Sequence, residues 1–136
     1  MRMSITAVPL LALMLMGFAQ HPGGSKVALG EQFKLKNGHQ AVVRGEKLSI
    51  TIQSVADSRC PSGVTCIWAG NGEVVIKVDK KSKKQVVATL NTSSEPKEIE
   101  YRGFKIKLIA LSPYPSSSES IDPKNYEATI VVSKDE

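Results

Sequence analysis

The fold is decided by the stretch KLSITIQSV, residues 47–55. Leu48, Ile50 and Ile52 alternate with polar residues along it. A period of two places the apolar side chains on one face of an extended strand, whereas a helix requires a period of about 3.6 residues. The stretch therefore predicts a β-strand with one buried face and one polar face.

Similar alternating runs lie on both sides of this stretch, separated by residues that favour turns. No segment after residue 30 has the spacing of an amphipathic helix. The other expected strands span residues 33–36, 40–43, 73–79, 85–90, 97–101, 104–111 and 126–132. The sequence thus predicts an all-β fold, an antiparallel β-sandwich with an Ig-like arrangement of seven to eight short strands and one intrachain disulfide.

Two local patterns refine this prediction. Asn37-Gly38 is typical of a hairpin turn between the two runs that flank it. The run from Leu108 to Leu111 is apolar at successive positions, which predicts a bulge or a strand end buried on both faces.

The first residues have the layout of a secretory signal peptide. Arg2 supplies a positive charge, an apolar run follows from Ile5 to Met16, and Gly17-Phe18-Ala19 provides small residues for cleavage. The alternative is a retained membrane anchor, but the apolar run is shorter than the roughly 20 residues that a spanning helix needs. We expect residues 1–19 to be a signal peptide, 20–30 a flexible N-terminal segment and 31–136 a single β-sandwich domain.

Charge and composition narrow the classes of partner. The chain has a formal net charge of +5, and its 18 basic residues are spread among 13 acidic ones. Aromatic residues make up only 5% of the chain, whereas nucleic-acid-binding proteins cluster arginine and aromatic residues on one face. With the leader, this pattern predicts a periplasmic or secreted protein that binds no nucleic acid.

The only two cysteines, Cys60 and Cys66, lie in the long connection after residues 47–55. In an exported chain they predict a structural disulfide, and closing so short a loop contributes roughly 2–2.5 kcal/mol to stability. A redox-active pair and a metal site are the alternatives. The spacing is not C-x-x-C, and no histidine lies nearby to complete a zinc site.

The order of strands predicts which loops meet. In an antiparallel sandwich, alternate connections lie at the same end, so loops 56–72, 91–97 and 112–125 are expected to share one end. The turn 80–84 is expected at the opposite end. We interpret the end with three loops as the binding surface.

Three residues of that end are candidates for the binding surface. Trp68 either packs on the disulfide in the core, as large apolar rings usually do, or forms an exposed platform for a sugar or a protein. Arg59 either pairs with Asp57 or contacts an anion. Tyr114, between two prolines, is either a contact residue or a lid on the core.

A cluster of lysines marks the opposite turn. Lys80, Lys81, Lys83 and Lys84 surround a single serine. The simpler interpretation is a solvated turn that also discourages edge-to-edge pairing. The alternative is peripheral contact with a membrane or with an anionic polysaccharide.

No arrangement of residues points to catalysis or to a cofactor. Neither histidine lies in a setting suited to a general base, and no serine lies in a G-x-S-x-G turn. We expect a small exported binding or structural module of the bacterial cell envelope, with no cofactor and with an unknown protein or envelope polysaccharide as partner. The alternatives are a protein–protein inhibitor or chaperone-like module that uses the three loops, and an envelope enzyme.

The run from Ser58 to Gly70 resembles the S-R-C-P-x-x-V-x-C-x-W-A-G signature of an uncharacterised group of small exported bacterial β-sandwich proteins. A second run of that group, L-x-P-Y-P, is similar to Leu111-Ser112-Pro113-Tyr114-Pro115. The resemblance covers about residues 31–133, judged against the expected strands. It implies a bacterial source and an envelope location, and it implies no catalytic role.

Overall fold

The computed structural model describes residues 24–117 and 119–135. The expected signal peptide and the first residues of the segment 20–30 lie outside this range. The strands are β1 Ser25–Val27, β2 Gln32–Lys36, β3 Gln40–Val43, β4 Leu48–Asp57, β5 Gly72–Lys80, β6 Val86–Asn91, β7 Glu98–Tyr101, β8 Phe104–Ser112 and β9 Glu127–Lys134. One 3₁₀ turn, η1 Pro123–Asn125, precedes β9.

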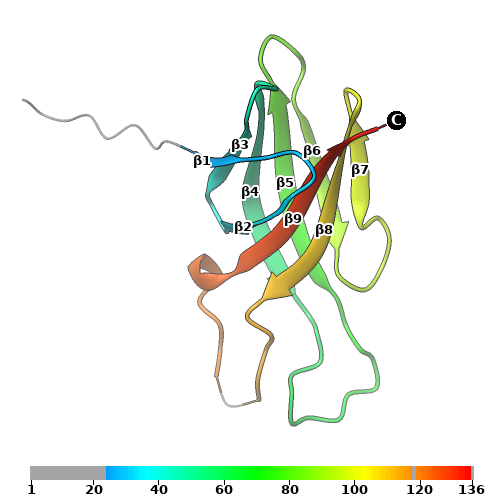
Figure 1. Ribbon diagram of the computed structural model, residues 1–136. Coiled ribbons are helices and arrows are strands. Elements are labelled where there is room, and N and C mark those ends of the chain that lie inside the picture. The colour runs from blue at the N-terminus through cyan, green and yellow to red at the C-terminus, as the bar shows by residue number, and fades with distance from the viewer. Residues whose placement is uncertain (1–23, 118, 136) are drawn as a thin grey trace, which may run out of the picture.

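These strands form two sheets that face each other (Figure 1). One sheet has the order β1-β3-β4-β5-β6 and the other has the order β2-β9-β8-β7. Every pair of neighbouring strands is antiparallel except β1 and β3. The predicted all-β sandwich with one disulfide is therefore confirmed.

The core lies between the sheets and is built from the alternating positions. On β4, Leu48, Ile50 and Ile52 are fully buried while the residues between them are partly exposed. From the other sheet, Ile106 and Ile130 are also fully buried. Burial of apolar surface at these positions supplies about 25 cal/mol per Å², the main force that holds the two layers together.

The segment 20–30 was expected to be flexible, and this is wrong for its described part. Residues Ser25–Val27 form β1, which pairs in parallel with β3. Val27 is buried against the core, and the backbone amide of Arg44 donates a hydrogen bond of 2.9 Å to its carbonyl oxygen. One buried side chain and this pairing are enough to fix a short edge strand.

The expected hairpin at Asn37-Gly38 is a crossing between sheets. The strand before it, β2, pairs with β9, whereas the strand after it, β3, pairs with β4. The turn is hydrogen-bonded to both sheets, because the backbone amide of Asn37 donates to the carbonyl oxygen of Tyr126 and that of Gly38 donates to the carbonyl oxygen of Ile52. Gly38 has a φ of 82°, the left-handed conformation that glycine adopts without strain.

Two bulges bend the long central strands. The register of β4 against β5 shifts between Ile52 and Ser54, and that of β8 against β9 shifts between Leu108 and Ala110. The second shift confirms one of the two outcomes expected for the apolar run 108–111. It turns the side chain of Ile109 to the surface, where 41% of it is exposed.

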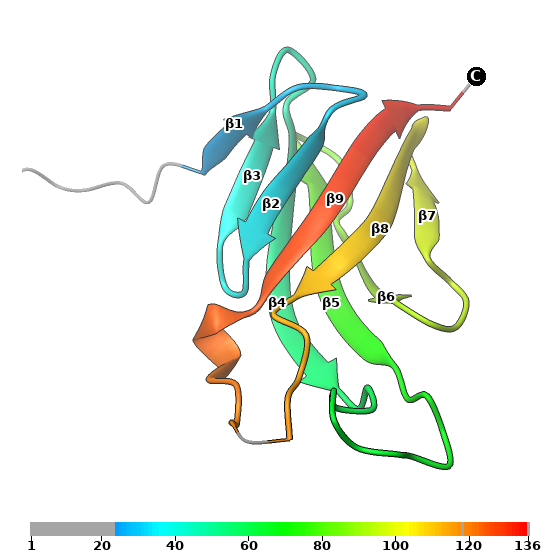
Figure 2. The same cartoon turned by 60° about the horizontal axis from the view of Figure 1, so that its bottom comes forward.

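The long loops and the lysine turn lie at opposite ends of the sandwich, as the strand order predicts. The connection after β4 and the connection after β8 project together at one end, and the β5–β6 turn lies at the other (Figures 1 and 2).

Among residues 24–117 and 119–135, no helix is long and apolar enough to cross a bilayer.

Candidate functional site

Residues 58–71, hereafter the disulfide loop, extend the β4–β5 hairpin beyond the sheet. The amide of Ser58 donates to Asn71 over 2.8 Å, and the amide of Cys60 donates to Ala69 over 2.9 Å. The predicted disulfide between Cys60 and Cys66 then closes the tip. The base and the tip of the loop are thus both fixed.

Gly70 allows the two arms of this base to approach closely. Its φ is 71°, and a Cβ at this position would overlap the carbonyl oxygen of Ser58. A side chain at position 70 would meet both a backbone clash and an unfavourable dihedral angle. The loop therefore depends on glycine here for its shape.

Arg59 forms the ion pair with Asp57 that was one of its two expected roles. Its Nε and Nη2 atoms each donate to a carboxylate oxygen of Asp57 over 2.8 Å. Both side chains are nearly inaccessible, with 7% of Arg59 and 4% of Asp57 exposed. The hydroxyl of Tyr126 also donates to Asp57, over 2.9 Å. Arg59 is therefore an internal support of the loop and does not belong to its exposed surface.

The same guanidinium joins the disulfide loop to the β8–β9 connection. Nη1 donates to the carbonyl oxygen of Leu111 over 2.7 Å, and Nη2 donates to that of Pro113 over 2.9 Å. The ring of Tyr114 covers the guanidinium at 4.9 Å, and its hydroxyl donates to the carbonyl oxygen of Cys60 over 2.8 Å. Tyr114 is thus anchored at both ends of its side chain while 58% of it stays exposed.

These contacts shift the acidities of the group. Burial raises the pKa of Asp57, but hydrogen bonds from Arg59 and Tyr126 and the charge of Arg59 outweigh burial and hold it below its ordinary value. Burial and the hydrogen bond to Asp57 raise the pKa of Tyr126. Asp57 stays ionised and Tyr126 stays neutral near neutral pH, which preserves the arrangement.

The third loop is tied to the disulfide loop on its other side. The amide nitrogen of the Asn71 side chain donates to Asn91 over 2.9 Å, and the backbone amide of Ser93 donates to the Asn71 side-chain oxygen over 3.0 Å. The hydroxyl of Thr92 accepts a hydrogen bond from the amide of Gly72 over 2.8 Å. Loops 56–72, 91–97 and 112–125 therefore meet at one end, as expected.

Trp68 is exposed, which excludes the first of its two expected placements, packing on the disulfide in the core, and leaves the second, an exposed side chain. It is 81% exposed, and its neighbour Ile67 is 93% exposed. The reason is geometric. The disulfide loop extends past the end of the core, and Leu111 and Tyr126 already close that end from beneath. Ile67 and Trp68 consequently project from a loop whose base is held rigidly.

A shallow depression of about 190 Å³ lies beside Tyr114 and is lined by residues of the β8–β9 connection. Typical ligand pockets enclose about 300–1,000 Å³. Trp68 does not line it. Of the three predicted site residues, Arg59 and Tyr114 contact each other directly. Trp68 lies on the exposed part of the disulfide loop.

Sequence reasoning missed Tyr126 and Asn91 as parts of this site. Tyr126 is 69 residues from Asp57 in sequence, and Asn91 is 20 residues from Asn71. No local spacing pattern connects residues so far apart. The one available signal was the parity of the strands, which brings the three loops together without identifying their contacts.

Comparison of the chain with protein-family models, with curated proteins and with solved structures finds no match. Within residues 24–117 and 119–135, no group of three or more metal-binding side chains is found. The geometry of the site is therefore the basis for a functional conclusion.

Proposed function

We propose that the chain is an exported bacterial binding module that inserts Ile67 and Trp68 into a hydrophobic cleft of a partner protein. The observation that carries this proposal is the exposure of two adjacent large apolar side chains on a fixed loop. Leaving Trp68 in water forgoes the burial energy that the core offers, roughly 25 cal/mol per Å² of apolar surface. A partner that covers these side chains recovers it.

The fixed base of the loop favours binding. A flexible loop loses conformational freedom when it binds, at roughly 0.5–1.5 kcal/mol for each immobilised side chain. Here the disulfide, Gly70 and the hydrogen bonds at Ser58 and Cys60 fix the backbone beforehand. Tryptophan is also prominent among the residues that dominate the energy of protein interfaces.

The absence of charged side chains from the tip of the loop also favours its burial in a hydrophobic cleft. From Cys60 to Gly72 the sequence has no acidic or basic side chain, although such residues make up 23% of the chain. Burying an unpaired charge costs far more than burying a neutral polar group. A surface without charges enters a hydrophobic cleft without that cost.

The shape of this end distinguishes the proposal from its alternatives. Because Trp68 is largely exposed and does not line the depression beside Tyr114, the protein is proposed to act as a ligand inserted into another protein, in the manner of an inhibitor or chaperone-like module. No catalytic activity is assigned to it. The clustering of loops at one end is also how Ig-like sandwiches present their binding loops.

The test measures partner capture from bacterial envelope extracts by residues 20–136. Wild type, Trp68→Ala and Ile67→Ala are compared with Val87→Ala, a control that removes an exposed apolar side chain from β6. We expect one protein to be recovered by wild type and Val87→Ala and lost with Trp68→Ala. Thermal unfolding should be unchanged in all three variants, because each altered side chain is at least half exposed.

Two outcomes would contradict the proposal. In the first, the proteins recovered by wild type and by Trp68→Ala are identical. In the second, binding survives protease treatment of the extract and is abolished by glycosidases, which would identify Trp68 as a platform for sugar rings.

A further inference from the structure

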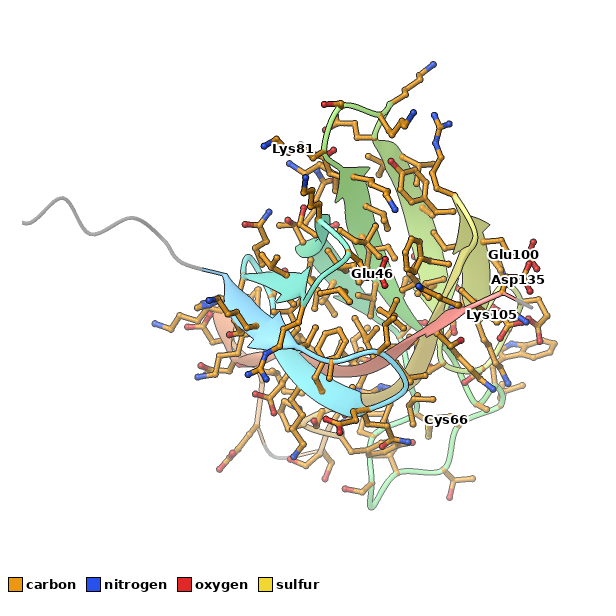
Figure 3. The ribbon with its side chains drawn as sticks, turned by 45° about the horizontal axis from the view of Figure 1, so that its top comes forward. Glu46, Cys66, Lys81, Glu100, Lys105 and Asp135 are labelled. Carbon is orange, nitrogen blue, oxygen red and sulfur yellow. A yellow bond between two sulfur atoms is a disulfide. The ribbon has the colours of Figure 1, made fainter. Side chains whose placement is uncertain are left out.

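The end of the sandwich opposite the disulfide loop carries an unusual concentration of positive charge. The lysine turn between β5 and β6 forms its tip and points away from the three long loops (Figure 1). Figure 3 turns this end toward the reader and shows Lys81 well separated from Cys66. We call the exposed side chains of Lys47, Lys81, Lys83, Lys84 and Arg102 the cationic end.

Three turns, drawn from both sheets, are tied together there. The backbone amide of Lys81 donates to the carbonyl oxygen of Lys47 over 3.1 Å, which joins the β5–β6 turn to the β3–β4 turn. The hydroxyl of Tyr101 donates to the carbonyl oxygen of Lys84 over 2.7 Å, which joins the same turn to the β7–β8 turn. The cationic side chains therefore project from one connected surface.

Lys80, at the end of β5, also contacts the opposite sheet. Its ammonium group lies 4.6 Å from the ring of Phe104 across the two sheets. The guanidinium of Arg102 lies 6.0 Å from the ring of Tyr101. These contacts hold the charges of Lys80 and Arg102 close to this end of the sandwich.

The positive charge of the cationic end is not neutralised by ion pairs. Among the described residues, the salt bridges involve Arg59, Lys105, Lys124 and Lys134, and none involves a member of the cationic end. The nearby carboxylate of Glu46 is 3.0 Å from the ammonium group of Lys134. Other acidic residues of the described chain lie near this end without an ion pair to it: Asp135, whose amide donates to the carbonyl oxygen of Gly103, Glu100 on β7 and Asp79 on β5.

We propose that the cationic end docks electrostatically on a bilayer surface rich in anionic phospholipids. The charges sit on three turns that are joined at one end of the sandwich, so a layer of phosphate headgroups can contact all three at once. A linear polyanion would instead be expected to follow a charged groove. Each basic residue near such a surface contributes about 1 kcal/mol, so five together support a measurable but reversible association.

This proposal concerns a different surface from the one that binds a partner protein, so either proposal can fail alone. Docking through the cationic end directs the disulfide loop away from the bilayer. Trp68, the only tryptophan of the chain, then faces the aqueous phase and stays accessible to a soluble partner.

The test is co-sedimentation of residues 20–136 with vesicles, because the apolar run 5–16 would itself bind lipid. Phosphatidylcholine vesicles with added phosphatidylglycerol are compared with phosphatidylcholine alone. We expect binding only to the anionic vesicles. It should be lost at about 1 M salt, where the Debye length is about 3 Å.

Two matched variants separate the cationic end from net charge. Lys81→Gln, Lys83→Gln and Lys84→Gln together should lower the partition coefficient by about 100-fold. The control combines Lys34→Gln, Lys36→Gln and Lys107→Gln, which remove the same charge from exposed positions on β2 and β8. It should retain most of the binding, and equal losses in the two variants would overturn the proposal.

The fluorescence of Trp68 reports which end faces the lipid. We expect its emission to stay at the wavelength of water-exposed tryptophan when the vesicles are added, and brominated lipids should not quench it. A blue shift with quenching would show that the disulfide loop inserts, which overturns docking through the cationic end. Binding to a soluble anionic polysaccharide without binding to vesicles would also overturn it.

Discussion

The guanidinium of Arg59 meets the carboxylate of Asp57 with two hydrogen bonds of 2.8 Å, and both side chains are shielded from water. The same guanidinium donates to Leu111 and Pro113, so one side chain joins the disulfide loop to the β8–β9 connection. Asp57 is consequently the counter-charge on which the contact between two loops depends.

Replacing Asp57 with asparagine removes this counter-charge and leaves the enclosed guanidinium of Arg59 with carbonyl partners but no opposite charge. We expect Asp57→Asn to lower the free energy of unfolding by about 3 kcal/mol, the range seen when one partner of a buried ion pair is removed. Urea denaturation at neutral pH measures it. Glu98→Gln is the control, because Glu98 pairs with Lys105 over 3.8 Å at an exposed site, where such pairs contribute at most about 1 kcal/mol.

The stability of the protein should depend on pH through the same pair. Because the pKa of Asp57 is lowered in the folded state, its contribution is complete above the unfolded value of about 3.9. It is lost as the pH falls through the lower folded pKa. The difference in unfolding free energy between wild type and Asp57→Asn should therefore shrink below about pH 4. A difference that stays constant down to pH 2 would contradict this assignment.

Tyr126 gives the opposite dependence at high pH. Its pKa is raised in the folded state, so its neutral form contributes stability below the unfolded value of about 10. That contribution is lost as the pH rises through the folded pKa. In Tyr126→Phe, whose ring has no hydroxyl to ionise, urea denaturation above about pH 10 should show a smaller loss of stability than in wild type. Equal losses in the two proteins would count against the assignment.

Removing the disulfide should destabilise the protein without unfolding it. Cys60→Ser with Cys66→Ser is expected to lower the unfolding free energy by about 2 kcal/mol, because a short loop is released in the unfolded chain. The circular dichroism spectrum should remain that of a β protein, since the core residues lie between the sheets. Wild type treated with a reductant serves as the control and should match the double variant, and an unchanged denaturation midpoint would argue against a structural role.

Gly70→Ala tests the close approach at the base of the disulfide loop. The added methyl group would overlap the carbonyl oxygen of Ser58 and place alanine at a positive φ. Gly30→Ala is the matched control, since Gly30 has a similar φ of 76° but open space around it. We expect Gly30→Ala to cost about 1 kcal/mol and Gly70→Ala clearly more, by thermal unfolding. Equal costs would mean that the loop rearranges freely.

The strands of this protein were predictable because their side chains alternate between a buried and an exposed face. Leu48, Ile50 and Ile52 show this directly, and the successive apolar residues at 108–111 indicated the bulge at Ile109. The strand β1 was missed because it is short and buries only Val27. The change of sheet at Asn37-Gly38 was missed because turn composition does not determine which strand pairs with which.

The candidate site was predictable only in part. The ion pair between Asp57 and Arg59 was an expected alternative, since the two residues are close in sequence. The exposure of Trp68 was one of two expected alternatives, and the sequence could not decide between them, because the general tendency of large rings to be buried fails where a loop extends past the core. Tyr126 joins the pair through tertiary structure alone.

The hydrogen bonds at Ser58 and Cys60 have a consequence for how this protein can change over time. They fix the two arms of the loop before the tip begins, the disulfide closes the tip, and the amide of Ser62 donates to Pro115 over 3.0 Å, so the side chains of Ile67 and Trp68 are not needed to hold this frame. Residues such as Ile67 and Trp68 can therefore be exchanged for others while the frame beneath them is retained. The domain is in this sense a scaffold on which this exposed segment is free to diversify independently of folding.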